Sequence, residues 1–480
     1  MRLIGKAFFA LGLAAIALAG CGEPQTTAER VEPASPRGVI LFLGDGMGVS
    51  TVTAARIFAG QLAGGTGEEH SLSFEGFPHV ALVKTYNVDA QVPDSAGTMT
   101  AIVTGEKTRA GVLSVSAAVE RGDCAAGLAE PLTTLLEQAE AAGFATGIVS
   151  TATITHATPA ATYAHAADRN WEDNSALPEE AVAAGCRDIA RQLVEFDGGD
   201  GIEVALGGGR GHFLPAGEPD PEYPDQAGFR TDGRNLVAEW LAGDGRAYAW
   251  NLPQLEALQA TPGQQVLGLF EPSHMQFEVD RAQDAEPSLA AMTEFALNRL
   301  MDRSPGYFLM VEGARIDHGH HFGNAYRALH DTLALDAAVA RALAMTDSAN
   351  TLILVTADHS HTLTISGYPR RGNPILGKVE FASGQLMKDA QGRPYTTLGY
   401  ANGPGALAEP VDLSDTDTEA AGYQQAAAVP MAIETHGGED VAAYAQGPGA
   451  AGVAGVMEQN RLYDVLYEGL FGHPPPVPEH

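Results

Sequence analysis

The sequence predicts an α/β fold in which a doubly wound, mostly parallel central sheet is flanked by helices. The first reason is that residues 39–43, 307–311 and 351–356 are short and almost wholly apolar, as in strands buried on both faces of a parallel sheet. The second is that such runs alternate with helical patterns along the chain. The third is that each run ends in glycine, carboxylate or histidine residues, and α/β folds bind their ligands at strand ends.

The pattern predicts further elements between these runs. Helices are expected over 131–142, 179–196, 287–301 and 325–345, and strands over 144–150 and 202–206. The segment 213–233 is rich in Pro, Gly and Asp and is expected to be irregular. From about 371 to 429 the alternation fades, which indicates a small domain inserted into an α/β domain formed by 38–370 and 430–472.

Length and charge limit the classes of function. The 480 residues suffice for one large α/β domain with insertions, or for two or three smaller domains. The formal net charge of −32 argues against nucleic acid as a partner, because a phosphate backbone would be repelled.

The N-terminus has the features of a targeting segment. Arg2 and Lys6 precede an apolar run over 7–19 that is too short to span a bilayer. The run ends in Leu-Ala-Gly-Cys at 18–21, which resembles the lipobox of bacterial lipoproteins, where the signal peptide is removed and Cys21 is lipidated. A plain secretory signal cleaved nearby is the alternative. Either reading predicts export, to the periplasm or the cell surface, with residues 22–37 as a flexible tether.

Two further cysteines, Cys124 and Cys186, remain if Cys21 carries lipid. An even remainder in an oxidising compartment favours a disulfide. Two buried free thiols are the alternative.

The segment 307–321 is the most informative part of the chain. Its apolar run is followed by Glu312 and Asp317, and by His318, His320 and His321. Burying so many unpaired charges would cost several kcal/mol per group, so they must face water or hold a cation. If a helix begins here, Asp317 and His321 are four residues apart and share one face, which suits zinc. A solvated loop is the alternative.

Other strand ends offer candidates for the same site. Asp45 lies between glycines after the first run, although a turn aspartate is the commoner role. Ser95 lies near the start of a predicted helix, either as an N-cap or as a nucleophile whose phosphorylated form would meet the helix N-terminus. Arg169 could grip two phosphate oxygens or lie free in solvent. Asp358 and His359 follow the last clear strand.

Six motifs then occur in order. They are GDGMG at 44–48, DSAGT at 94–98, THATP at 155–159, VEGARIDHGHH at 311–321, TADHSH at 356–361 and ETHGGED at 434–440. In this order and spacing they resemble the alkaline phosphatase family, and specifically the branch that includes the vertebrate enzymes. The resemblance runs from about Val39 to Gly472. It implies broad-specificity hydrolysis of small phosphate monoesters at alkaline pH through a phosphoserine intermediate.

The resemblance also implies the roles of single residues. The implied sets are Asp317, His321 and His436 for one zinc; Asp45, Asp358 and His359 for a second zinc; Asp45, Thr158 and Glu312 for magnesium; Ser95, Arg169 and Asp94 for catalysis; and His156, His318 and His361 as groups behind the ligands. The chemistry agrees, because the zinc sets mix nitrogen and oxygen while the magnesium set is all oxygen. His320 receives no role.

Further features carried by the resemblance are a calcium site, a disulfide, an insertion and a dimer. The calcium ligands would be Glu222, the carbonyl of Phe270, Glu271 and Glu286, the last of which replaces the usual aspartate. Cys124 and Cys186 match a family disulfide. Residues 371–429 resemble the crown-like insertion near the dimer axis, so a homodimer anchored to the membrane by its lipid is expected.

Two rival functions remain to be distinguished. Phosphodiesterases and sulfatases of the same superfamily replace the serine and lack the magnesium ligands, whereas this chain has Ser95, Thr158 and Glu312. A lipoprotein that only stores metal or captures phosphate would not need both Ser95 and Arg169.

Overall fold

The central sheet has ten strands in the order β15-β2-β14-β8-β1-β7-β3-β4-β6-β5. The computed structural model describes residues 37–261, 263–406 and 411–476. The strands of this sheet are β1 Arg37–Gly44, β2 His79–Lys84, β3 Ala145–Thr153, β4 Val204–Gly208, β5 Arg246–Ala249, β6 Gln265–Leu269, β7 Gly306–Gly313, β8 Thr351–Ala357, β14 Val441–Gln446 and β15 Gly455–Glu458. All pairings from β8 to β5 are parallel, and β14 is antiparallel to both of its neighbours. The predicted mostly parallel sheet is confirmed.

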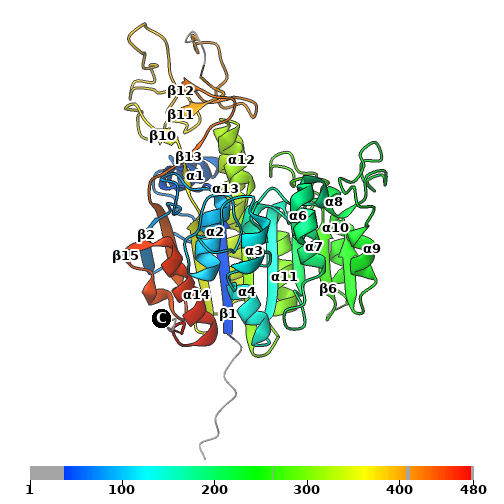
Figure 1. Cartoon of the computed structure of the whole chain (residues 1–480). Coiled ribbons are helices and arrows are strands. Elements are labelled where there is room, and N and C mark those ends of the chain that lie inside the picture. The colour runs from blue at the N-terminus through cyan, green and yellow to red at the C-terminus, as the bar shows by residue number, and fades with distance from the viewer. Residues whose placement is uncertain (1–36, 262, 407–410, 477–480) are drawn as a thin grey trace, which may run out of the picture. The chain divides into compact units, whose positions relative to one another are not determined.

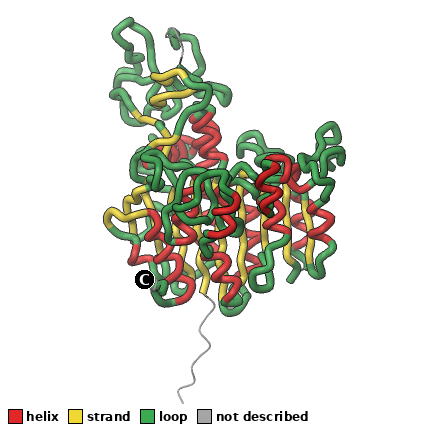
Figure 2. The backbone as a smooth tube through the Cα atoms, viewed as in Figure 1, coloured by secondary structure: helices red, strands yellow, loops and turns green. Residues whose placement is uncertain are grey.

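Helices cover both faces of this sheet, as a doubly wound fold requires (Figures 1 and 2). One face carries α1 Val49–Leu62, α11 Leu289–Leu300 and α13 Ala325–Met345, and the other carries α2 Ser95–Thr104, α4 Leu135–Ala141 and α14 Leu462–Phe471. The shorter helices are α3 Cys124–Ala129, α5 Ala157–Ala160, α6 Glu179–Ala184, α7 Ile189–Val194, α8 Arg210–Phe213, α9 Leu236–Leu241, α10 Leu252–Leu258 and α12 Arg315–His321. Three 3-10 turns are η1 Asn174–Ala176, η2 Ala450–Gly452 and η3 Gln459–Arg461.

The core strands are buried on both faces, which explains their apolar sequences. All eight residues of β7 and all seven of β8 are buried, and seven of the eight in β1 are. These three strands are direct neighbours, with β1 between the other two. Their carboxyl ends therefore lie side by side at one edge of the sheet.

A second, smaller sheet lies beyond that edge (Figure 1). It pairs β10 Leu363–Ile365, β11 Leu398–Gly403 and β12 Ala427–Pro430, and its surroundings are mostly loop (Figure 2). A two-stranded pairing of β9 Ser360–His361 with β13 His436–Gly437 joins this region to the end of β8. That pairing brings His436 next to His361, although 75 residues separate them in the chain.

Several predicted bounds differ from the structure. The helix expected over 179–196 is wrong, because Gly185 takes φ +92° and ends α6 before α7 begins. The helix expected from 131 starts at Leu135, where Thr134 forms a capping box with Glu137. The expected strand 144–150 is three residues longer at its end, and 202–206 is shifted to 204–208. The helix expected over 325–345 is confirmed at both ends.

The predicted disulfide is present and joins Cys124 to Cys186 with their Cα atoms 6.0 Å apart. The predicted signal peptide over 1–21, lipidated Cys21 and all of the tether except Arg37, which opens β1, lie outside the described residues. No helix in the described ranges is both long enough and apolar enough to cross a bilayer.

Candidate metal and phosphate site

The predicted site residues come from separate segments of the chain that meet at the carboxyl ends of the central strands. Asp45 follows β1, Thr158 lies in the short helix after β3, Glu312 ends β7, and Asp358 with His359 follows β8. Asp317 and His321 share α12, and Ser95 is the first residue of α2. The sheet therefore brings together residues that are up to 391 positions apart in sequence (Asp45 and His436).

The first group contains Asp317, His321 and His436. The Nε2 atoms of the two histidines are 3.3 Å apart, and each lies 3.4 Å from an Asp317 oxygen. The Nδ1–H of His321 donates to the Glu434 carbonyl at 2.6 Å, and that of His436 donates to the Pro93 carbonyl at 2.8 Å. In the neutral rings both Nε2 atoms therefore carry lone pairs, and these point at each other and at a carboxylate.

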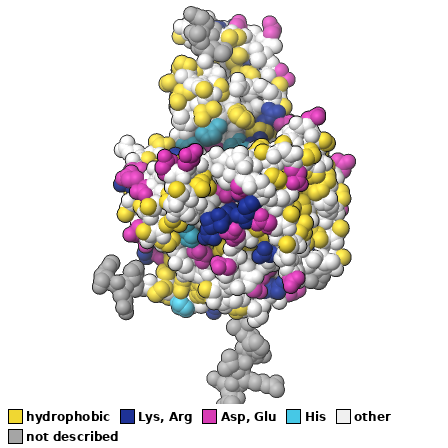
Figure 3. Space-filling model, turned by 45° about the vertical axis from the view of Figure 1, so that its right-hand side comes forward, with side chains coloured by type: hydrophobic (Ala, Val, Ile, Leu, Met, Phe, Trp, Pro, Cys, Tyr) yellow, Lys and Arg dark blue, Asp and Glu magenta, His cyan; other side chains and the backbone are white. Residues whose placement is uncertain are grey.

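Such an arrangement of lone pairs is repulsive unless a cation lies among them. Orienting the far nitrogen of each ligand histidine by a carbonyl is the usual arrangement at protein zinc sites. The side chains of His321 and His436 are 22% and 17% exposed, whereas those of Asp45 and Asp358 are almost fully buried. The first group therefore forms the solvent side of the site. Figure 3 shows histidine side chains at the surface where the small upper lobe meets the body.

The second group contains Asp45, Asp358 and His359, all fully buried. The His359 Nε2 lies 3.2 Å from Asp358 Oδ2 and 3.5 Å from Asp45 Oδ1, and its Nδ1–H faces the Ser360 carbonyl at 3.2 Å. Burial and the neighbouring Asp358 raise the pKa of Asp45 well above its usual value, and burial raises that of Asp358. Two buried carboxylates and one imidazole lone pair thus share a space that favours a divalent cation.

The third group contains Asp45, Thr158 and Glu312. Buried oxygens of all three, Asp45 Oδ2, Thr158 Oγ1 and Glu312 Oε1, have no hydrogen-bond partner in the described structure. Burial raises the pKa of Glu312 to about 7, although its Oε2 accepts a hydrogen bond of 2.5 Å from Ser150. Unsatisfied buried oxygens from three residues match the requirements of a hard cation such as magnesium.

Ser95 lies beside the second group. Its Oγ is 3.2 Å from His359 Nε2 and 3.4 Å from Asp45 Oδ1, and the residue is 2% exposed. The N-cap of α2 is Asp94 and not Ser95, because the Asp94 carboxylate accepts the Gly97 N–H at 3.1 Å. The Ser95 hydroxyl is therefore not used in capping and remains available at the helix N-terminus.

Arg169 faces the same space from the loop after α5. Its Nη1 donates to Asp94 Oδ2 at 3.1 Å and its Nη2 donates to His156 Nε2 at 3.1 Å. Burial opposes ionisation of Asp94, but Arg169 and the N–H groups of Gly97 and Gly111 hold its pKa below the usual value. Asp94 thus both caps α2 and orients the guanidinium.

The histidines predicted to lie behind the ligands have fixed partners. His361 lies between Asp317 Oδ1 at 2.6 Å and Glu434 Oε2 at 2.5 Å, and although burial opposes its charge, these carboxylates raise its pKa to about 10. His318 accepts from Arg315 Nη1 at 2.7 Å. The His320 ring lies between the hydroxyl groups of Thr51, at 2.9 Å, and Tyr400, at 2.8 Å, and is not part of the three groups.

The calcium set is less complete. Burial and the nearby Glu271 raise the pKa of Glu286 to about 8, and Glu286 Oε2 is buried without a partner. Glu222 Oε2, however, is already paired with Arg210 Nη2 at 3.0 Å. The carboxylates of this set do not form a tight cluster of ligand atoms among the described residues, whereas Asp45, Asp358 and His359 do.

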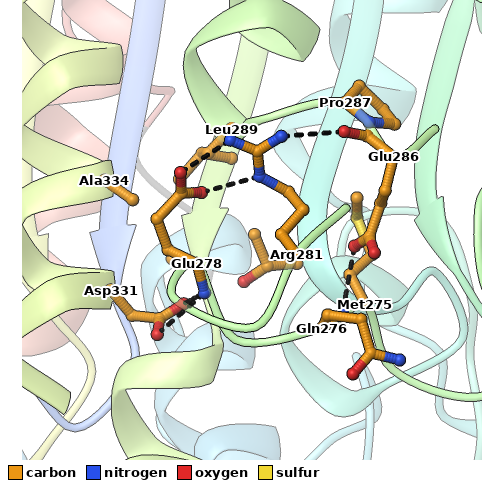
Figure 4. A pocket seen from close by; sticks show the side chains of 11 residues that line it. Met275, Gln276, Glu278, Arg281, Glu286, Pro287, Leu289, Asp331 and Ala334 are labelled. Carbon is orange, nitrogen blue, oxygen red and sulfur yellow. Dashed lines mark hydrogen bonds and ion pairs between the residues drawn. The ribbon is translucent and has the colours of Figure 1, made fainter. Parts of the chain in front are cut away.

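A small enclosed pocket lies next to Glu286 (Figure 4). Arg281 in this pocket donates to both oxygens of Glu278 and to the Glu286 carbonyl, and Asp331 accepts the Glu278 N–H at 3.3 Å. Its volume of about 10 Å³ holds about one water molecule. The charged groups of this pocket bond mainly to one another, so they stabilise the loop that contains Arg281 and Glu286.

Three residues near the site were not predicted, namely Glu434, Arg315 and His274. Glu434 and Arg315 lie inside quoted motifs, yet only their partners in space, His361 and His318, identify their roles. His274 follows the end of β6, where its ring centroid is 4.4 Å from that of His318. A polar residue beyond a parallel strand was an available signal for His274, but β6 itself was not predicted.

Comparisons with known proteins identify the family and the fold of this chain. The family model described as alkaline phosphatase matches residues 36–470. The tissue-nonspecific alkaline phosphatase of Gallus gallus is 48% identical over 91% of this chain and 85% of that protein, and an alkaline phosphatase of Gadus morhua is 46% identical over 91% and 92%. Among solved structures, alkaline phosphatases of the Antarctic bacterium TAB5 and of Thermus thermophilus share the fold. Their TM-scores are 0.63 and 0.64 at 23% and 24% identity, covering 91% and 95% of this chain and 98% and 96% of theirs.

Proposed function

This chain belongs to the alkaline phosphatase family of metal-dependent phosphomonoesterases, and from that premise we propose how its own residues carry out the reaction. The enzyme hydrolyses phosphate monoesters. The residue roles, the metal count and the covalent intermediate described below are our proposal.

Ser95 is proposed as the nucleophile. The observation that carries this is the position of its Oγ, 3.2 Å from His359 Nε2 and 3.4 Å from Asp45 Oδ1 at the start of α2. Its Oγ forms a bond to phosphorus as the bond from phosphorus to the alcohol oxygen breaks, and the alcohol leaves with a proton. Water then cleaves the phosphoserine and releases inorganic phosphate.

Three divalent cations are proposed, two zinc and one magnesium. The donor sets fit, because they combine facing imidazole lone pairs with buried carboxylate and hydroxyl oxygens that lack partners. When bound, these cations would lower the pKa of the Ser95 hydroxyl and neutralise charge on the phosphoryl oxygens. The proposed ligands are Asp317, His321 and His436 for one zinc; Asp45, Asp358 and His359 for the second zinc; and Asp45, Thr158 and Glu312 for magnesium.

Arg169 and the N-terminus of α2 hold the phosphoryl group. The guanidinium is fixed by Asp94 and by His156, so its fork is oriented before substrate binds. The N-terminus of α2, where Ser95 is the first residue, favours a dianion beside it. None of these contacts reaches the alcohol, so broad specificity is expected. The alkaline optimum is attributed to the need for deprotonated oxygen nucleophiles.

The test uses purified protein loaded with zinc and magnesium. Ser95→Ala is expected to lower kcat for p-nitrophenyl phosphate by at least about 10³-fold. Metal content, measured by mass spectrometry, should stay close to that of the wild type. Ser383→Ala, an exposed serine in the insertion, is the matched control and should retain full activity.

Acid quenching during turnover, followed by peptide mass spectrometry, should identify phosphate on the peptide that contains Ser95. Wild-type turnover in Ser95→Ala would exclude the covalent mechanism. Turnover of bis-p-nitrophenyl phosphate at the rate of the monoester would instead favour the phosphodiesterase alternative.

A calcium ion is proposed at Glu271, Glu286 and the Phe270 carbonyl, with Glu222 as a further ligand. The unpartnered Glu286 Oε2 and its raised pKa support this site. Its occupation requires Glu222 to leave Arg210, or to share an oxygen with it. Calcium binding measured calorimetrically in wild type and in Glu286→Ala tests the assignment.

A homodimer is proposed to form through the insertion over 371–429. Exposed apolar side chains in and beside this region support the proposal: Tyr368 at 88%, Phe381 at 47%, Val429 at 53% and Met431 at 42% exposed. Light scattering after gel filtration gives the mass in solution.

Export and a lipid anchor at Cys21 are also proposed. In a detergent phase separation, Cys21→Ser should move the protein from the detergent phase to the aqueous phase.

A further inference from the structure

Three histidine rings pack together beside the proposed phosphate position, and only His156 has a role in the mechanism above, as a partner of Arg169. The ring centroids of His156, His274 and His318 form a triangle with sides of 5.4, 5.7 and 4.4 Å. His274 comes from the loop after β6, His156 from the start of α5 and His318 from α12. Three imidazoles brought together by three separate segments require an explanation.

Each ring has one nitrogen that accepts from a fixed donor. His274 Nδ1 accepts the Thr153 backbone N–H at 3.1 Å. His318 Nδ1 accepts from Arg315 Nη1 at 2.7 Å, and His156 Nε2 accepts from Arg169 Nη2 at 3.1 Å. A backbone N–H and a guanidinium can only donate, so these three ring nitrogens must carry lone pairs.

The tautomer of each ring follows from these bonds. A ring in which one nitrogen accepts a hydrogen bond holds a single proton and is neutral. Each neutral ring then carries its proton on the other nitrogen, which is Nε2 in His274 and His318 and Nδ1 in His156. The cluster therefore presents three N–H donors.

None of these three N–H groups finds an acceptor among the described residues. His156 Nδ1 is buried without a partner, and no carboxylate, carbonyl or hydroxyl of the described chain bonds His274 Nε2 or His318 Nε2. Unpaired N–H donors close together in a half-buried site are costly unless an outside acceptor completes them. Arg169 and Arg315 donate to the cluster, and their positive charge favours an anion beside it, although carboxylate oxygens of Asp45 and Glu312 lie within 4.8 Å of a His156 nitrogen.

We propose that His274 is a positioning residue for the phosphoryl group, acting with His156 and His318 as a three-imidazole donor cluster that holds an oxyanion oxygen through N–H bonds. His274 packs on the His318 ring, fixes its orientation, and adds its own Nε2–H to the donor set. This inference rests on the proposed function, because the oxyanion is the phosphoryl group bound at Ser95 and Arg169.

Substitutions of His274 separate donation from ring packing. His274→Phe keeps the ring but loses both nitrogens, whereas His274→Gln keeps one acceptor for the Thr153 N–H and one N–H donor. In holoenzyme, His274→Phe should weaken binding of inorganic phosphate about tenfold by calorimetry, and raise KM similarly with kcat changed less than about threefold. His274→Gln should retain binding to within about threefold of wild type.

His330→Gln is the matched control. His330 is also a stacked ring, packed on Phe58 and Tyr326, but it lies on α13 away from the cluster. Its phosphate affinity should equal that of wild type. If His274→Phe does not fold, wild-type protein labelled with ¹⁵N-histidine gives a second measurement. The His274 Nε2–H signal should shift downfield and exchange more slowly when phosphate is added.

Several results would overturn the proposal. Equal loss of phosphate affinity in His274→Phe and His274→Gln would show that the ring only fills space. A fall in kcat with unchanged KM would place the effect outside phosphate positioning. Weaker magnesium binding with unchanged phosphate binding would assign the donors to water held by that cation. Because every result is compared with active wild type, failure here is distinct from failure of Ser95 as the nucleophile.

Discussion

At the scale of single residues, the site is explained by counting donors and acceptors. The far nitrogens of His321, His436 and His359 each face a backbone carbonyl, which leaves a lone pair on every Nε2. These lone pairs converge on carboxylates, so the chain has assembled acceptors without donors. Only a cation satisfies such a set.

Glu434 is the residue whose substitution tests this reasoning most directly. Its Oε2 bonds His361 Nδ1 at 2.5 Å, and His361 Nε2 in turn bonds Asp317, a proposed zinc ligand. Glu434→Gln should lower the pKa of His361 from about 10 and loosen Asp317. We expect zinc affinity to fall about 10–100-fold, measured by competition with a chelator.

Glu439→Gln is the control for that variant, because the Glu439 carboxylate accepts a hydrogen bond from Ser360 Oγ at 2.8 Å and no hydrogen bond or ion pair joins it to a histidine of the described chain. Its zinc affinity should match wild type. Unchanged affinity in Glu434→Gln would mean that His361 does not orient the Asp317 ligand.

At the scale of elements, the sequence predicted the strands and helices that position the site. The apolar runs before Asp45, Glu312 and Asp358 are β1, β7 and β8, because strands buried on both faces leave no alternation to misread. The Asp317 and His321 pair does share one short helix.

Elements with weaker patterns could not be predicted in the same way. Strand β2, which lies between β15 and β14, alternates buried and exposed residues over only six positions, and β5 and β6 are four and five residues long. His274 and Glu434 acquire their roles only from neighbours distant in sequence, which local periodicity does not encode. The break at Gly185 shows the same limit, since an amphipathic pattern continues across it.

The disulfide gives a prediction about α3 and the chain after α6. Cys124 and Cys186 are 62 residues apart. A disulfide that closes a loop of this size restricts the unfolded chain and so stabilises the folded state by about 4 kcal/mol. The double variant Cys124→Ser, Cys186→Ser should therefore have a lower Tm with nearly unchanged kcat. Calorimetry of the holoenzyme measures the Tm. A reductant should lower the Tm of the wild type to that of the double variant, and should leave the Tm of the variant unchanged.

A second prediction concerns the opposite end of β3 from the metals. Glu140 is 1% exposed, its Oε2 has no partner, and burial raises its pKa to about 8 against an ordinary 4.5. Glu203 accepts a hydrogen bond from the Thr146 backbone N–H, and burial raises the pKa of Glu203 to about 7. Because the folded pKa values are raised, the folded state keeps protons that the unfolded state releases. Stability should fall as pH rises from about 4.5 to 8.

Glu140→Gln removes one of these protonation requirements. Its Tm should exceed that of wild type by about 2–4 °C at pH 9, and the difference should vanish near pH 4.5. Glu137→Gln is unsuitable as a control because it removes the ion pair between Glu137 and His165 Nε2 at 2.9 Å, so Glu256→Gln, on α10, serves instead. A constant difference at every pH would contradict the role of the raised pKa.

At the scale of the whole molecule, a formal net charge of −32 surrounds a site that must attract a dianion. The proposed cations and Arg169 reverse the sign of the potential locally, while the acidic surface disfavours larger polyanions such as nucleic acid. Phosphate binding should therefore depend on metal occupancy more than on ionic strength. The same cations also hold together segments from β1, β7, β8 and the 434–440 motif, so they act on stability as well.

Metal removal tests both roles at once. Without cations, Asp45 and Asp358 are buried carboxylates whose pKa values burial raises, and the pKa of Glu312 rises to about 7. The folded metal-free protein then holds protons that its unfolded chain releases as pH rises, so its stability should fall between about pH 5 and pH 8. The stability of the holoenzyme should be nearly constant over the same range. We expect chelation to lower Tm by about 10 °C or more at pH 9 and by clearly less at pH 6. Scanning calorimetry at both pH values measures the two differences.

Addition of zinc and magnesium together should restore Tm and turnover, while calcium alone should restore neither, since its proposed ligands lie outside the three groups. A loss of Tm of equal size at both pH values would mean that these carboxylates are not the groups that the cations neutralise.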